Sequence, residues 1–298
     1  MLTAALTPDD ISTPMPTPAN RIAFQGYPGA YSNLACKSAF PTMTALPSAS
    51  FEDAFAAVRE GKARLAMIPI DNSIAGRVAD IHHLMPHSGL HIIGEHFQRV
   101  EHCLLGLKGA RLEELKEAHS HVHALGQCRN AIKQLGLKAV VHADTAGAAQ
   151  DVATWGDPTK AAISSSLAAE IYGLKILKRN IEDAEYNTTR FLVMSRKAQR
   201  PEPGNGPCIT SFVFRVRSVP AALYKALGGF ATNKVNISKL ESYIINPFFT
   251  VAQFYVDADA HIDEEPMQFA FEELKFFSTD LTVLGVYPAH PFRRKGKA

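Results

Sequence analysis

The chain reads Asn187-Thr188-Thr189-Arg190-Phe191 at the point around which the rest of the sequence is organised. The apolar run that begins at Phe191 and ends at Met194 predicts a short buried strand. Polar groups at the mouth of such a strand are held still by the sheet and face a crevice, where open α/β sheets bind ligands. An arginine there can bind a carboxylate through two hydrogen bonds, and a threonine hydroxyl can donate a proton to a departing oxygen. The alternative is a loop whose threonine and asparagine only cap and turn.

Length and composition narrow the class of protein. The chain has 298 residues, which suffices for two or three compact units. A hydrophobic share of 46% is ordinary for a globular protein, and a formal net charge of +2 gives no argument for nucleic-acid or membrane binding. No apolar run reaches membrane-spanning length. The cysteines are scattered and form no C-x-x-C pair, which predicts reduced, buried thiols and a cytoplasmic protein: Cys36, Cys103, Cys128 and Cys208.

The first predicted strand, 22–24, runs into a glycine-containing loop at 25–33, and a helical pattern begins near Leu34. Backbone N–H groups at such a corner can bind an anion. The glycine spacing differs from G-x-G-x-x-G, so we reject a nicotinamide site. Ser32 is either a ligand contact or only the helix N-cap.

A second polar strand exit follows the predicted helix 51–60 and strand 65–70. It reads Asp71-Asn72-Ser73-Ile74-Ala75-Gly76, with three small polar side chains and then a glycine before the next helix. We interpret Asn72 and Ser73 as ligand contacts. The alternative, a helix cap at Asp71 or Ser73, accounts for one of these side chains and leaves the others unassigned.

The middle of the chain repeats the strand–helix pattern. Strands predicted at 121–125, 140–142 and 161–163 each precede a helix, which predicts a mostly parallel sheet. Gln127 and Thr145 follow two of these strands, and serines follow the third. A strand at 101–107 would carry the chain into this part. We therefore expect two α/β lobes around a cleft lined by hydroxyls, amides and helix N-termini, which suits a small carboxylate-rich ligand and not a polyanion.

Two groups of histidines do not predict a metal site. Pro86 interrupts the helical pattern that holds His82, His83, His87 and His91, so i, i+4 spacing does not bring them to one face. A second group, His119, His121 and His123, alternates as in a strand and has no identifiable fourth zinc ligand.

The pattern changes after residues 197–207, which read as a linker by composition. The predicted order is then strand 209–216, helix 220–230, strands 236–245 and 248–256, helix 264–277 and strand 281–287. This β-α-β-β-α-β order is the ferredoxin-like plan, and such a unit often pairs its sheet with a copy of itself. The basic residues at 293–297 predict a solvated tail.

These pieces, in this order, resemble a prephenate dehydratase with a C-terminal ACT regulatory domain, from Arg21 to Pro288. The matching stretches are 26–32, 68–73 with Gly76, 124–128, 144–146, 161–163 with 172–174, and Asn187 with the signature Thr189-Arg190-Phe191. The resemblance implies an α/β fold: a two-lobed periplasmic-binding-protein-like catalytic domain plus an α+β ferredoxin-like ACT domain. The boundaries we expect are a flexible leader 1–20, a catalytic domain 21–196 (lobe 1 about 21–99 and 180–196, lobe 2 about 100–179), a linker 197–207, an ACT domain 208–290 and a basic tail 291–298.

The resemblance also implies an activity: prephenate loses water and carbon dioxide to give phenylpyruvate in phenylalanine biosynthesis, without cofactor or metal. The family's catalytic threonine falls on Thr189. The substrate-binding residues we expect are Ser32, Asn72, Ser73, Gln127, Thr145, Asn187 and Arg190. Either Arg190 or the backbone N–H groups at Ser32 and Ser73 would hold a substrate carboxylate, or Arg190 points away and pairs structurally. An ionised carboxylate near the leaving oxygen would repel the substrate.

The sequence departs from the family at four places: Asp71 stands for Glu, Val122-His123 for Pro-Gln, Ala221 for Gly, and Tyr243-Ile244 for Arg-Pro. The last two fall in the family's phenylalanine site, so inhibition by phenylalanine stays open. If present, that site would lie between ACT units of a homodimer or homotetramer and would use Ala222, Leu223, Asn236, Ile237, Glu241 and Ser242.

Two rival functions stay open at this point. Arogenate dehydratase is a close enzymatic one, because arogenate differs from prephenate by an amino group in place of the keto oxygen. A non-catalytic two-lobed amino-acid sensor is the other, since solute-binding proteins share the two-lobed plan. The Thr189-Arg190-Phe191 signature argues against the sensor.

Overall fold

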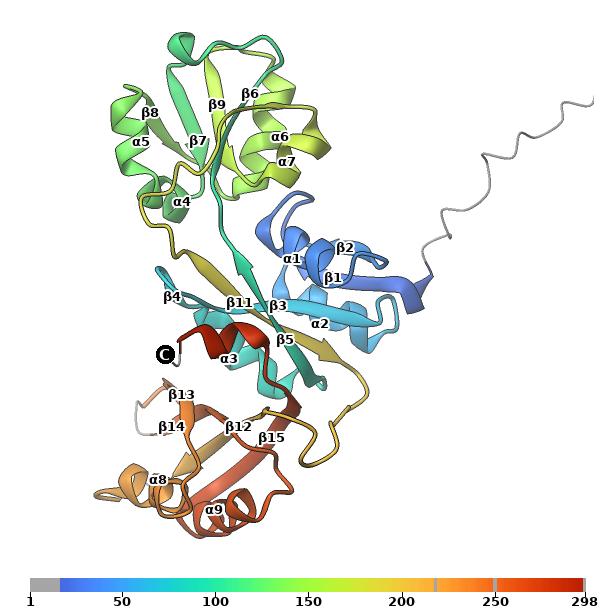
Figure 1. Ribbon diagram of the computed structural model, residues 1–298, viewed down its shortest axis with the longest axis vertical. Helices are drawn as coiled ribbons and strands as arrows, with labels where there is room; N and C mark the ends of the chain where they lie inside the picture. Colours follow the sequence, from blue (N-terminus) through green and yellow to red (C-terminus); the bar gives the residue numbers. More distant parts are fainter. Residues whose placement is uncertain (1–16, 217–218, 249–250, 297–298) are drawn as a thin grey trace, which may run out of the picture.

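A computed structural model describes residues 17–216, 219–248 and 251–296 (Figure 1). Three bodies lie one above another along the long axis. Lobe 2 comprises β6–β10 and their helices, lobe 1 lies in the middle and comprises β1–β5 and β11, and the C-terminal unit comprises β12–β15. The first sixteen residues of the predicted leader lie outside the described residues, and Pro18–Asn20 form a 3-10 turn, η2.

The three bodies are built from the following elements. Lobe 1 contains β1 (Arg21–Gln25), α1 (Tyr31–Ala39), β2 (Thr44–Ser48), α2 (Phe51–Arg59), β3 (Leu65–Asn72), β4 (Gly76–Arg77), α3 (Ala79–Leu84), η3 (Met85–His87), β5 (His91–Arg99) and β11 (Thr188–Ser195). Lobe 2 contains β6 (Cys103–Gly106), η4 (Leu112–Glu114), β7 (Glu117–Ser120), α4 (Val122–Gln127), α5 (Arg129–Gln134), β8 (Lys138–Val141), α6 (Thr145–Trp155), β9 (Lys160–Ser164), α7 (Ser166–Tyr172) and β10 (Lys175–Lys178). The C-terminal unit contains β12 (Cys208–Val216), α8 (Ala222–Thr232), β13 (Ile237–Ile244), β14 (Ala252–Ala258), α9 (Glu265–Phe277) and β15 (Ser278–Pro288), followed by η5 (Pro291–Gly296).

The sheets of both lobes are mixed, so the expectation of a mostly parallel sheet was wrong. In lobe 1, β2, β1 and β3 run parallel, but β11 is antiparallel to both β3 and β5. In lobe 2, β8, β7 and β9 run parallel, but β6 is antiparallel to β9 and β10. The reason is that the chain passes between the lobes twice, after β5 and after β10. The strand that follows each crossing, β6 in lobe 2 and β11 in lobe 1, runs against the strands of the strand–helix units. The result is the two-lobed plan of periplasmic binding proteins.

The predicted strand at 121–125 is the helix α4, and the strand β7 lies just before it. Alternating histidines at 119, 121 and 123 suggested a strand. Burial does not alternate here: the adjacent residues Ala124 and Leu125 of α4 are both buried, in one apolar cluster with Cys128 and with Ala131 of α5. His121 caps this helix, because its ring accepts a hydrogen bond from the His123 N–H at 3.4 Å.

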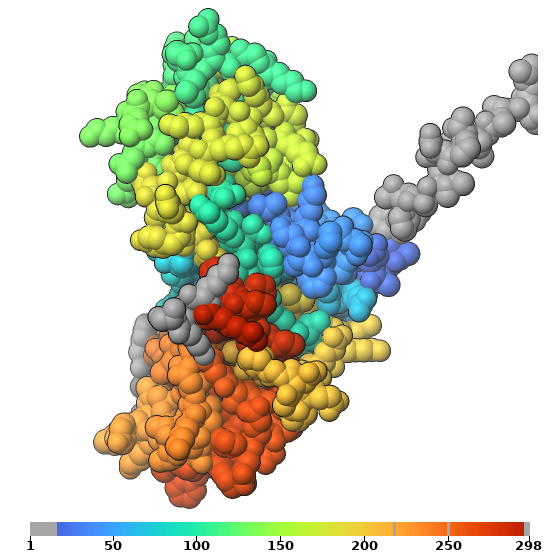
Figure 2. Space-filling view, in the orientation of Figure 1, coloured from blue at the N-terminus to red at the C-terminus, as the bar shows by residue number. Residues whose placement is uncertain are grey.

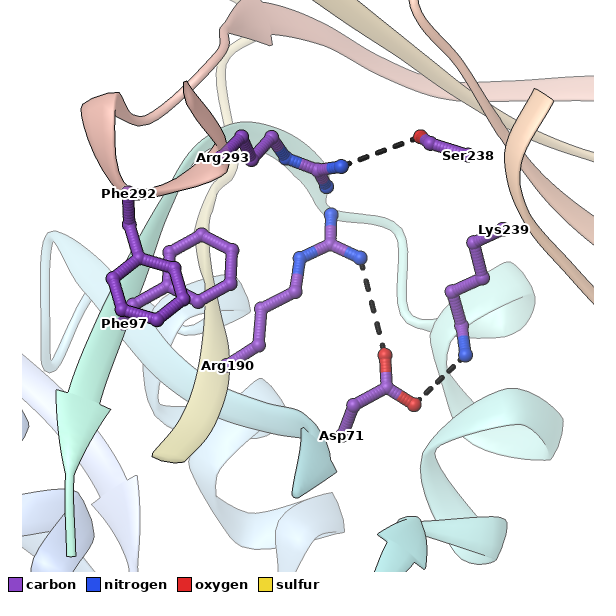
Figure 3. A pocket seen from close by; sticks show the side chains of 7 residues that line it. All are labelled: Asp71, Phe97, Arg190, Ser238, Lys239, Phe292 and Arg293. Carbon is purple, nitrogen blue, oxygen red and sulfur yellow. Dashed lines mark hydrogen bonds and ion pairs between the residues drawn. The ribbon is translucent and has the colours of Figure 1, made fainter. Parts of the chain in front are cut away.

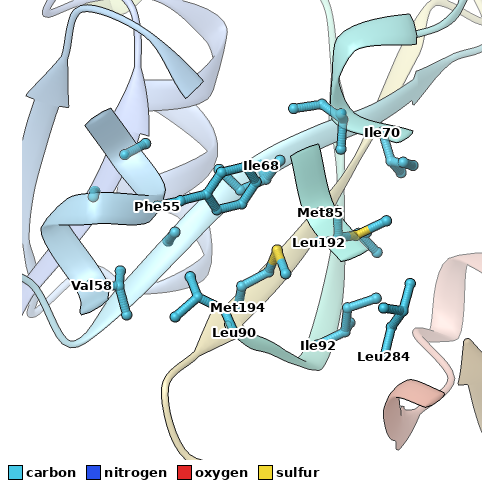
Figure 4. Close-up of a cluster of buried hydrophobic side chains, with 14 of the residues drawn as sticks. Phe55, Val58, Ile68, Ile70, Met85, Leu90, Ile92, Leu192, Met194 and Leu284 are labelled. Atoms are coloured by element: carbon cyan, nitrogen blue, oxygen red, sulfur yellow. The ribbon is translucent and has the colours of Figure 1, made fainter. Parts of the chain in front are cut away.

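Lobe 1 and the C-terminal unit share one hydrophobic core (Figure 4). Phe55 and Met85, from the helical side of lobe 1, pack on Ile68 and Leu192 of its sheet, and Leu284 of β15 belongs to the same cluster. The two sheets join where Gly285 pairs with Ile92, and a Cβ at Gly285 would collide with the Ile92 backbone. The C-terminal unit is therefore packed against the lobe and is not a loosely tethered module.

The C-terminal unit has the predicted β-α-β-β-α-β order. Its strands lie in the order β13-β14-β12-β15 and pair antiparallel throughout. Both helices contribute to one cluster on the sheet, in which Phe230 of α8 and Phe271 of α9 pack on Phe212 of β12. The ferredoxin-like fold is thus confirmed. Among the described helices, none is long and apolar enough to cross a bilayer, and all four cysteines are free and buried, as predicted.

His82 of α3 is enclosed at the junction between lobe 1 and the C-terminal unit. It is 1% exposed and packs against the rings of Tyr243 and Tyr255. Neither ring nitrogen has a hydrogen-bond partner among the described residues. Burial, with Lys239 nearby, lowers the pKa of His82 to about 4, while Asp71 and Glu241 act in the opposite direction.

We expect this histidine to weaken the fold in acid. Because its folded-state pKa is lowered, the unfolded chain binds more protons below pH about 6.5, and stability falls between about pH 6.5 and 4 by roughly 1.4 kcal/mol per unit. His82→Leu should flatten this part of the curve and raise the urea midpoint at pH 5. His87→Gln, at an exposed histidine, is the control and should leave the curve unchanged. An equal acid loss in the His82→Leu protein would show that other groups cause it.

Candidate active site

Several strands of lobe 1 end in polar residues, and these residues lie together at the edge of the sheet that faces lobe 2. Since β1, β2 and β3 run parallel, their carboxyl ends, at Gln25, Ser48 and Asn72, lie at the same edge. The strand β11 runs the other way and begins there, and its register places Thr189 directly opposite Asn72. The sheet therefore brings together two polar residues that are 117 positions apart.

A continuous set of hydrogen-bonded side chains links both lobes at this edge. The Asn72 amide nitrogen donates to Asn187 Oδ1 at 2.8 Å and to Thr189 Oγ1 at 2.9 Å. Asn187 Nδ2 donates to Gln127 Oε1 of lobe 2 at 2.9 Å. The His102 ring follows, with Nε2 2.9 Å from the same Gln127 oxygen and Nδ1 2.8 Å from the Tyr31 hydroxyl. We call these six residues the Thr189 cluster.

The Thr189 cluster is built from uncharged groups. Asn187 and His102 are 1% and 2% exposed, and burial lowers the pKa of His102, which favours the neutral ring. The Thr189 oxygen accepts a hydrogen bond from Asn72, and its own O–H has no acceptor among the described residues. Thr189 is partly exposed. The arrangement therefore leaves a donor hydroxyl at the junction of the lobes, in surroundings that would not repel an anion.

Three predicted substrate contacts belong to the Thr189 cluster: Asn72, Gln127 and Asn187. Ser73 lies next to it, where its hydroxyl donates to the Tyr186 carbonyl at 2.8 Å and accepts from the Thr188 N–H at 2.9 Å. The cap alternatives for Asp71 and Ser73 were wrong. Instead of opening a helix, β3 turns into β4, and the α3 N-cap is Val78.

Ser32 and Thr145 stand at helix starts, and neither hydroxyl belongs to the Thr189 cluster. Ser32 is the second residue of α1, whose N-cap is Ala30, so the cap alternative for Ser32 was wrong. Thr145 is the first residue of α6, after the capping residue Asp144. Asp144 lines an inter-lobe cavity of about 450 Å³ with residues 25–28, 47–49 and 143. Two members of the Thr189 cluster, Tyr31 and His102, were missed; a histidine inside the apolar stretch 101–107 was the available signal.

The lobes touch at the glycine loop that follows β1. Tyr172 of α7 donates its hydroxyl to the Pro28 carbonyl at 2.8 Å, and Ser165 donates to the Gly29 carbonyl. Gly29 has φ +91°, and a Cβ there would lie 2.8 Å from the Ala168 Cα. Only glycine permits this approach.

We therefore expect Gly29→Ala to push the lobes apart and lower kcat/KM for the substrate by up to ~10²-fold, the loss that a misplacement of about 1 Å can cause. Gly109→Ala is the matched control. Gly109 also has a positive φ, +96°, but a Cβ there would meet nothing within 4 Å. Steady-state kinetics of both variants measure the difference. Equal losses would attribute the effect to backbone strain and not to lobe contact.

Arg190 points toward the C-terminal unit (Figure 3), and because neighbouring strand residues alternate, Thr189 faces the other side of the sheet. Its Nε donates to Glu95 at 2.8 Å, its Nη1 to Asp257 at 2.5 Å, and its Nη2 to the Tyr287 hydroxyl at 3.0 Å. Burial alone would lower the pKa of Arg190, but Asp257 and Glu95 hold it well above its ordinary value. Of the two alternatives for Arg190, binding a substrate carboxylate or pairing structurally, the structure has the structural pairing. The Arg190 side chain does not reach the Thr189 cluster.

The start of the predicted solvated tail is instead anchored, at Phe292 and Arg293. Arg293 of η5 binds both oxygens of Glu95, at 2.7 and 2.9 Å, and Phe292 stacks on Phe97 with ring centroids 4.7 Å apart. In Figure 2 the C-terminal segment lies over the junction between lobe 1 and the C-terminal unit. It was missed because its partner Glu95 lies 198 positions away. A cavity of about 540 Å³ lies beside this segment. Seven side chains line it: Asp71, Phe97, Arg190, Ser238, Lys239, Phe292 and Arg293.

The six residues of the predicted effector site are distributed over two faces of the C-terminal unit. Leu223 and Ile237 pack on its helix-side cluster, next to Ala222, and Asn236 donates to Asp259 at 2.8 Å. Glu241 pairs with Arg77 and Lys239, and the Ser242 carbonyl accepts from Arg77 at 2.9 Å. The Glu241 side chain therefore faces lobe 1, whereas Ser242 contacts lobe 1 only through its backbone carbonyl, because its side chain points to the other face of the strand. No group of three or more potential metal ligands lies together in the described part of the chain.

Comparison with known proteins identifies the family. The family model described as prephenate dehydratase matches residues 22–199, more than half of the chain. The chain belongs to the prephenate dehydratase family. A bifunctional N-acyl-homoserine lactone acylase/prephenate dehydratase of Komagataeibacter europaeus is 54% identical over 92% of this chain and 98% of its own length. Arogenate dehydratase/prephenate dehydratase 1 of Arabidopsis thaliana is 38% identical over 90% of this chain and 72% of its own.

A solved relative supports the same fold. The prephenate dehydratase from Arthrobacter aurescens, determined in complex with L-Phe, superposes with a TM-score of 0.82 and 30% identity over 90% of each chain. The prephenate dehydratase family thus accounts for the two lobes and the lyase class of the enzyme.

Proposed function

We propose that this chain is a prephenate dehydratase that converts prephenate to phenylpyruvate, water and carbon dioxide in phenylalanine biosynthesis. The observation that carries the proposal is the Thr189 hydroxyl. It lies at the junction of the lobes, is held by Asn72, and keeps its proton free for a ligand. Membership in the prephenate dehydratase family supports the substrate.

The reaction needs little from the protein beyond help for a leaving group. The ring C–O bond and the bond to the ring carboxylate break, the electron pair of the latter enters the ring, and the hydroxide takes a proton. Aromatisation drives these steps. Thr189 donates its hydrogen bond or proton to the departing oxygen, a contribution of typically ~10²–10⁴ in rate. The neutral amides around it do not repel the two carboxylates of the substrate.

Turnover of the purified chain tests the proposal. We expect phenylpyruvate to accumulate from prephenate at neutral pH, in step with release of carbon dioxide. Binding of prephenate without any product would instead support the two-lobed sensor. No metal or cofactor is added in this experiment, because the reaction requires none in the proposed mechanism.

Two neighbouring activities need separate tests. The plant relatives are named for arogenate, and Asp144 in the inter-lobe cavity offers a carboxylate that could accept its ammonium group. Comparing kcat/KM for both substrates, in the wild type and in Asp144→Asn, decides between prephenate and arogenate, since asparagine preserves the helix cap.

The Komagataeibacter relative is named as an acylase, so hydrolysis of N-acyl-homoserine lactones should be assayed too. The Thr189 oxygen has an amide and no base as its partner among the described residues, which favours dehydration.

We further propose that residues 208–290 form an ACT regulatory domain after a linker at 197–207, with residues 21–196 as the catalytic domain in a cytoplasmic homo-oligomer. The complex of the Arthrobacter relative with L-Phe supports phenylalanine as the effector. Calorimetry with phenylalanine should show saturable heat, and absence of heat would remove the regulatory part. Glu241→Gln should alter this binding if the site is where the sequence places it.

A further inference from the structure

The hydrogen bonds of the Thr189 cluster have a fixed direction. Asn72 Oδ1 accepts from the backbone N–H groups of Ile74 and Ala75 at 3.0 and 2.8 Å. The Asn72 amide nitrogen must therefore face Asn187 and Thr189, where it donates. Asn187 accepts on Oδ1 and so presents its nitrogen to Gln127, which accepts on Oε1. The backbone after β3 thus sets the orientation of three side-chain amides in turn.

This direction assigns the tautomer of His102. Its Nε2 lies 2.9 Å from Gln127 Oε1, an atom that can only accept, so Nε2 carries the hydrogen. Its Nδ1 then accepts from the Tyr31 hydroxyl at 2.8 Å. Tyr31 also has the Glu101 carbonyl at 3.1 Å, which would accept its hydrogen bond if the ring became charged. Burial lowers the pKa of His102, so the neutral Nε2–H form is the one at neutral pH.

The consequence appears at Gln127, on the lobe opposite Thr189. Its oxygen is occupied by two N–H donors, from Asn187 and His102. Its amide nitrogen therefore turns away from both, and its N–H groups have no hydrogen-bond partner within residues 17–216, 219–248 and 251–296. Gln127 is partly exposed. Two unpartnered donors thus come from opposite lobes: the Thr189 O–H and the Gln127 amide.

We propose that His102 is a positioning residue, whose Nε2–H holds Gln127 with its amide N–H groups toward a carboxylate or other oxyanion of the substrate. The proposal rests on the proposed dehydratase function. His102 acts through Gln127 and does not exchange protons with the substrate, because the amides between it and Thr189 do not carry protons along. Tyr31 fixes the tautomer, and both lobes must be in place for the Thr189 cluster to form.

Kinetics of a double-mutant cycle test whether His102 acts through Gln127. His102→Leu and Gln127→Leu should each lower kcat/KM for prephenate about tenfold or more, the value of one well-placed hydrogen bond. The double variant should lose no more than Gln127→Leu alone, because the two residues form one unit. His102→Gln restores an N–H near the Nε2 position and should recover most of the activity. Losses that multiply, or no recovery in His102→Gln, would overturn the proposal.

A spectroscopic measurement keeps the test independent of activity and of damaged variants. In the full-length chain labelled with ¹⁵N-histidine, the His102 signals should show a protonated Nε2 and an unprotonated Nδ1 at neutral pH. Tyr31→Phe removes the phenol proton and should shift the Nδ1 signal. A protonated Nδ1 in the wild type would overturn the proposal whatever the kinetics. A chain with the expected tautomer but no turnover of any substrate would instead overturn the proposed function.

Discussion

Replacing Thr189 by valine should lower kcat for prephenate by a factor of about 10²–10⁴ and leave the protein folded. Valine keeps the branched shape of threonine and removes only the hydroxyl. The hydroxyl oxygen accepts one hydrogen bond from Asn72 at 2.9 Å, and its proton has no other acceptor among the described residues. Loss of the proton donor should therefore affect the reaction more than the fold. We expect KM to change much less than kcat, because the interaction strengthens as the C–O bond breaks.

Two matched variants make this result interpretable. Thr188→Val makes the same change one residue earlier, where strand geometry turns the side chain to the other face of the sheet, and it should keep kcat within about threefold. Thr189→Ser retains a hydroxyl and should recover part of the rate. The assay is formation of phenylpyruvate under saturating prephenate, with the unfolding midpoint measured for each protein. A Thr189→Val enzyme of wild-type kcat would falsify the assignment of Thr189.

Replacing Arg190 by methionine should destabilise the protein by about 3–5 kcal/mol, because it leaves buried charges without their partner. The side chains of Glu95 and Asp257 are 0% exposed, and Arg190 contacts both. Arg293 would remain as the cation for two carboxylates. Burial raises the pKa of Asp257, but Arg190 and the hydroxyls of Ser211 and Tyr255 outweigh it and hold that pKa below the ordinary value. Lysine should not restore stability, since it cannot reproduce the forked geometry.

Urea unfolding at two pH values measures this effect. In Arg190→Met the pKa of Asp257 should rise, because a group that lowers it is removed. The loss of stability relative to wild type should then be largest where Asp257 must ionise and should shrink from pH 7 to pH 5. Arg111→Met is the control, because Arg111 is 71% exposed and its ion pairs with Glu113 and Glu114 lie at the surface. That change should stay within about 1 kcal/mol. A similar small loss for both variants would mean that the buried pairs contribute no more than surface ones.

The sequence predicted the buried strands well, because apolar runs with polar ends are local signals. The strand predicted at 191–194 runs from Thr188 to Ser195, and the strand predicted at 65–70 runs from Leu65 to Asn72. Their pairing was not predictable. It depends on an antiparallel register with an irregularity between Arg190 and Phe191, which no local pattern encodes. The contact between Asn72 and Thr189, on which the site depends, therefore needed the structure.

The face on which Arg190 lies was in principle available from the sequence. Successive strand residues point to opposite sides, so Thr189 and Arg190 could not both face the same cleft. What the sequence could not supply were the partners, since Glu95 and Asp257 lie 95 and 67 positions away. The contact of Arg293 in the C-terminal segment with Glu95 was likewise unpredictable, because 198 positions separate the two residues.

Two departures from the family pattern acquire a physical meaning in the structure. Ala221, which stands for a family glycine, keeps a left-handed backbone with φ 59° at the start of α8. The backbone shape that glycine favours is therefore retained at the expense of some strain. Tyr243, which stands for an arginine, is buried against lobe 1 beside His82 and accepts from Gln253 at 2.6 Å. This second substitution thus serves the junction with lobe 1.

The most direct test of the central claim is product analysis after mixing the purified chain with prephenate at neutral pH. The account predicts phenylpyruvate and carbon dioxide in equal amounts at a rate proportional to enzyme concentration, reduced to near the uncatalysed rate in Thr189→Val. Prephenate that is bound but recovered unchanged, or product formed equally fast by the valine variant, would contradict it.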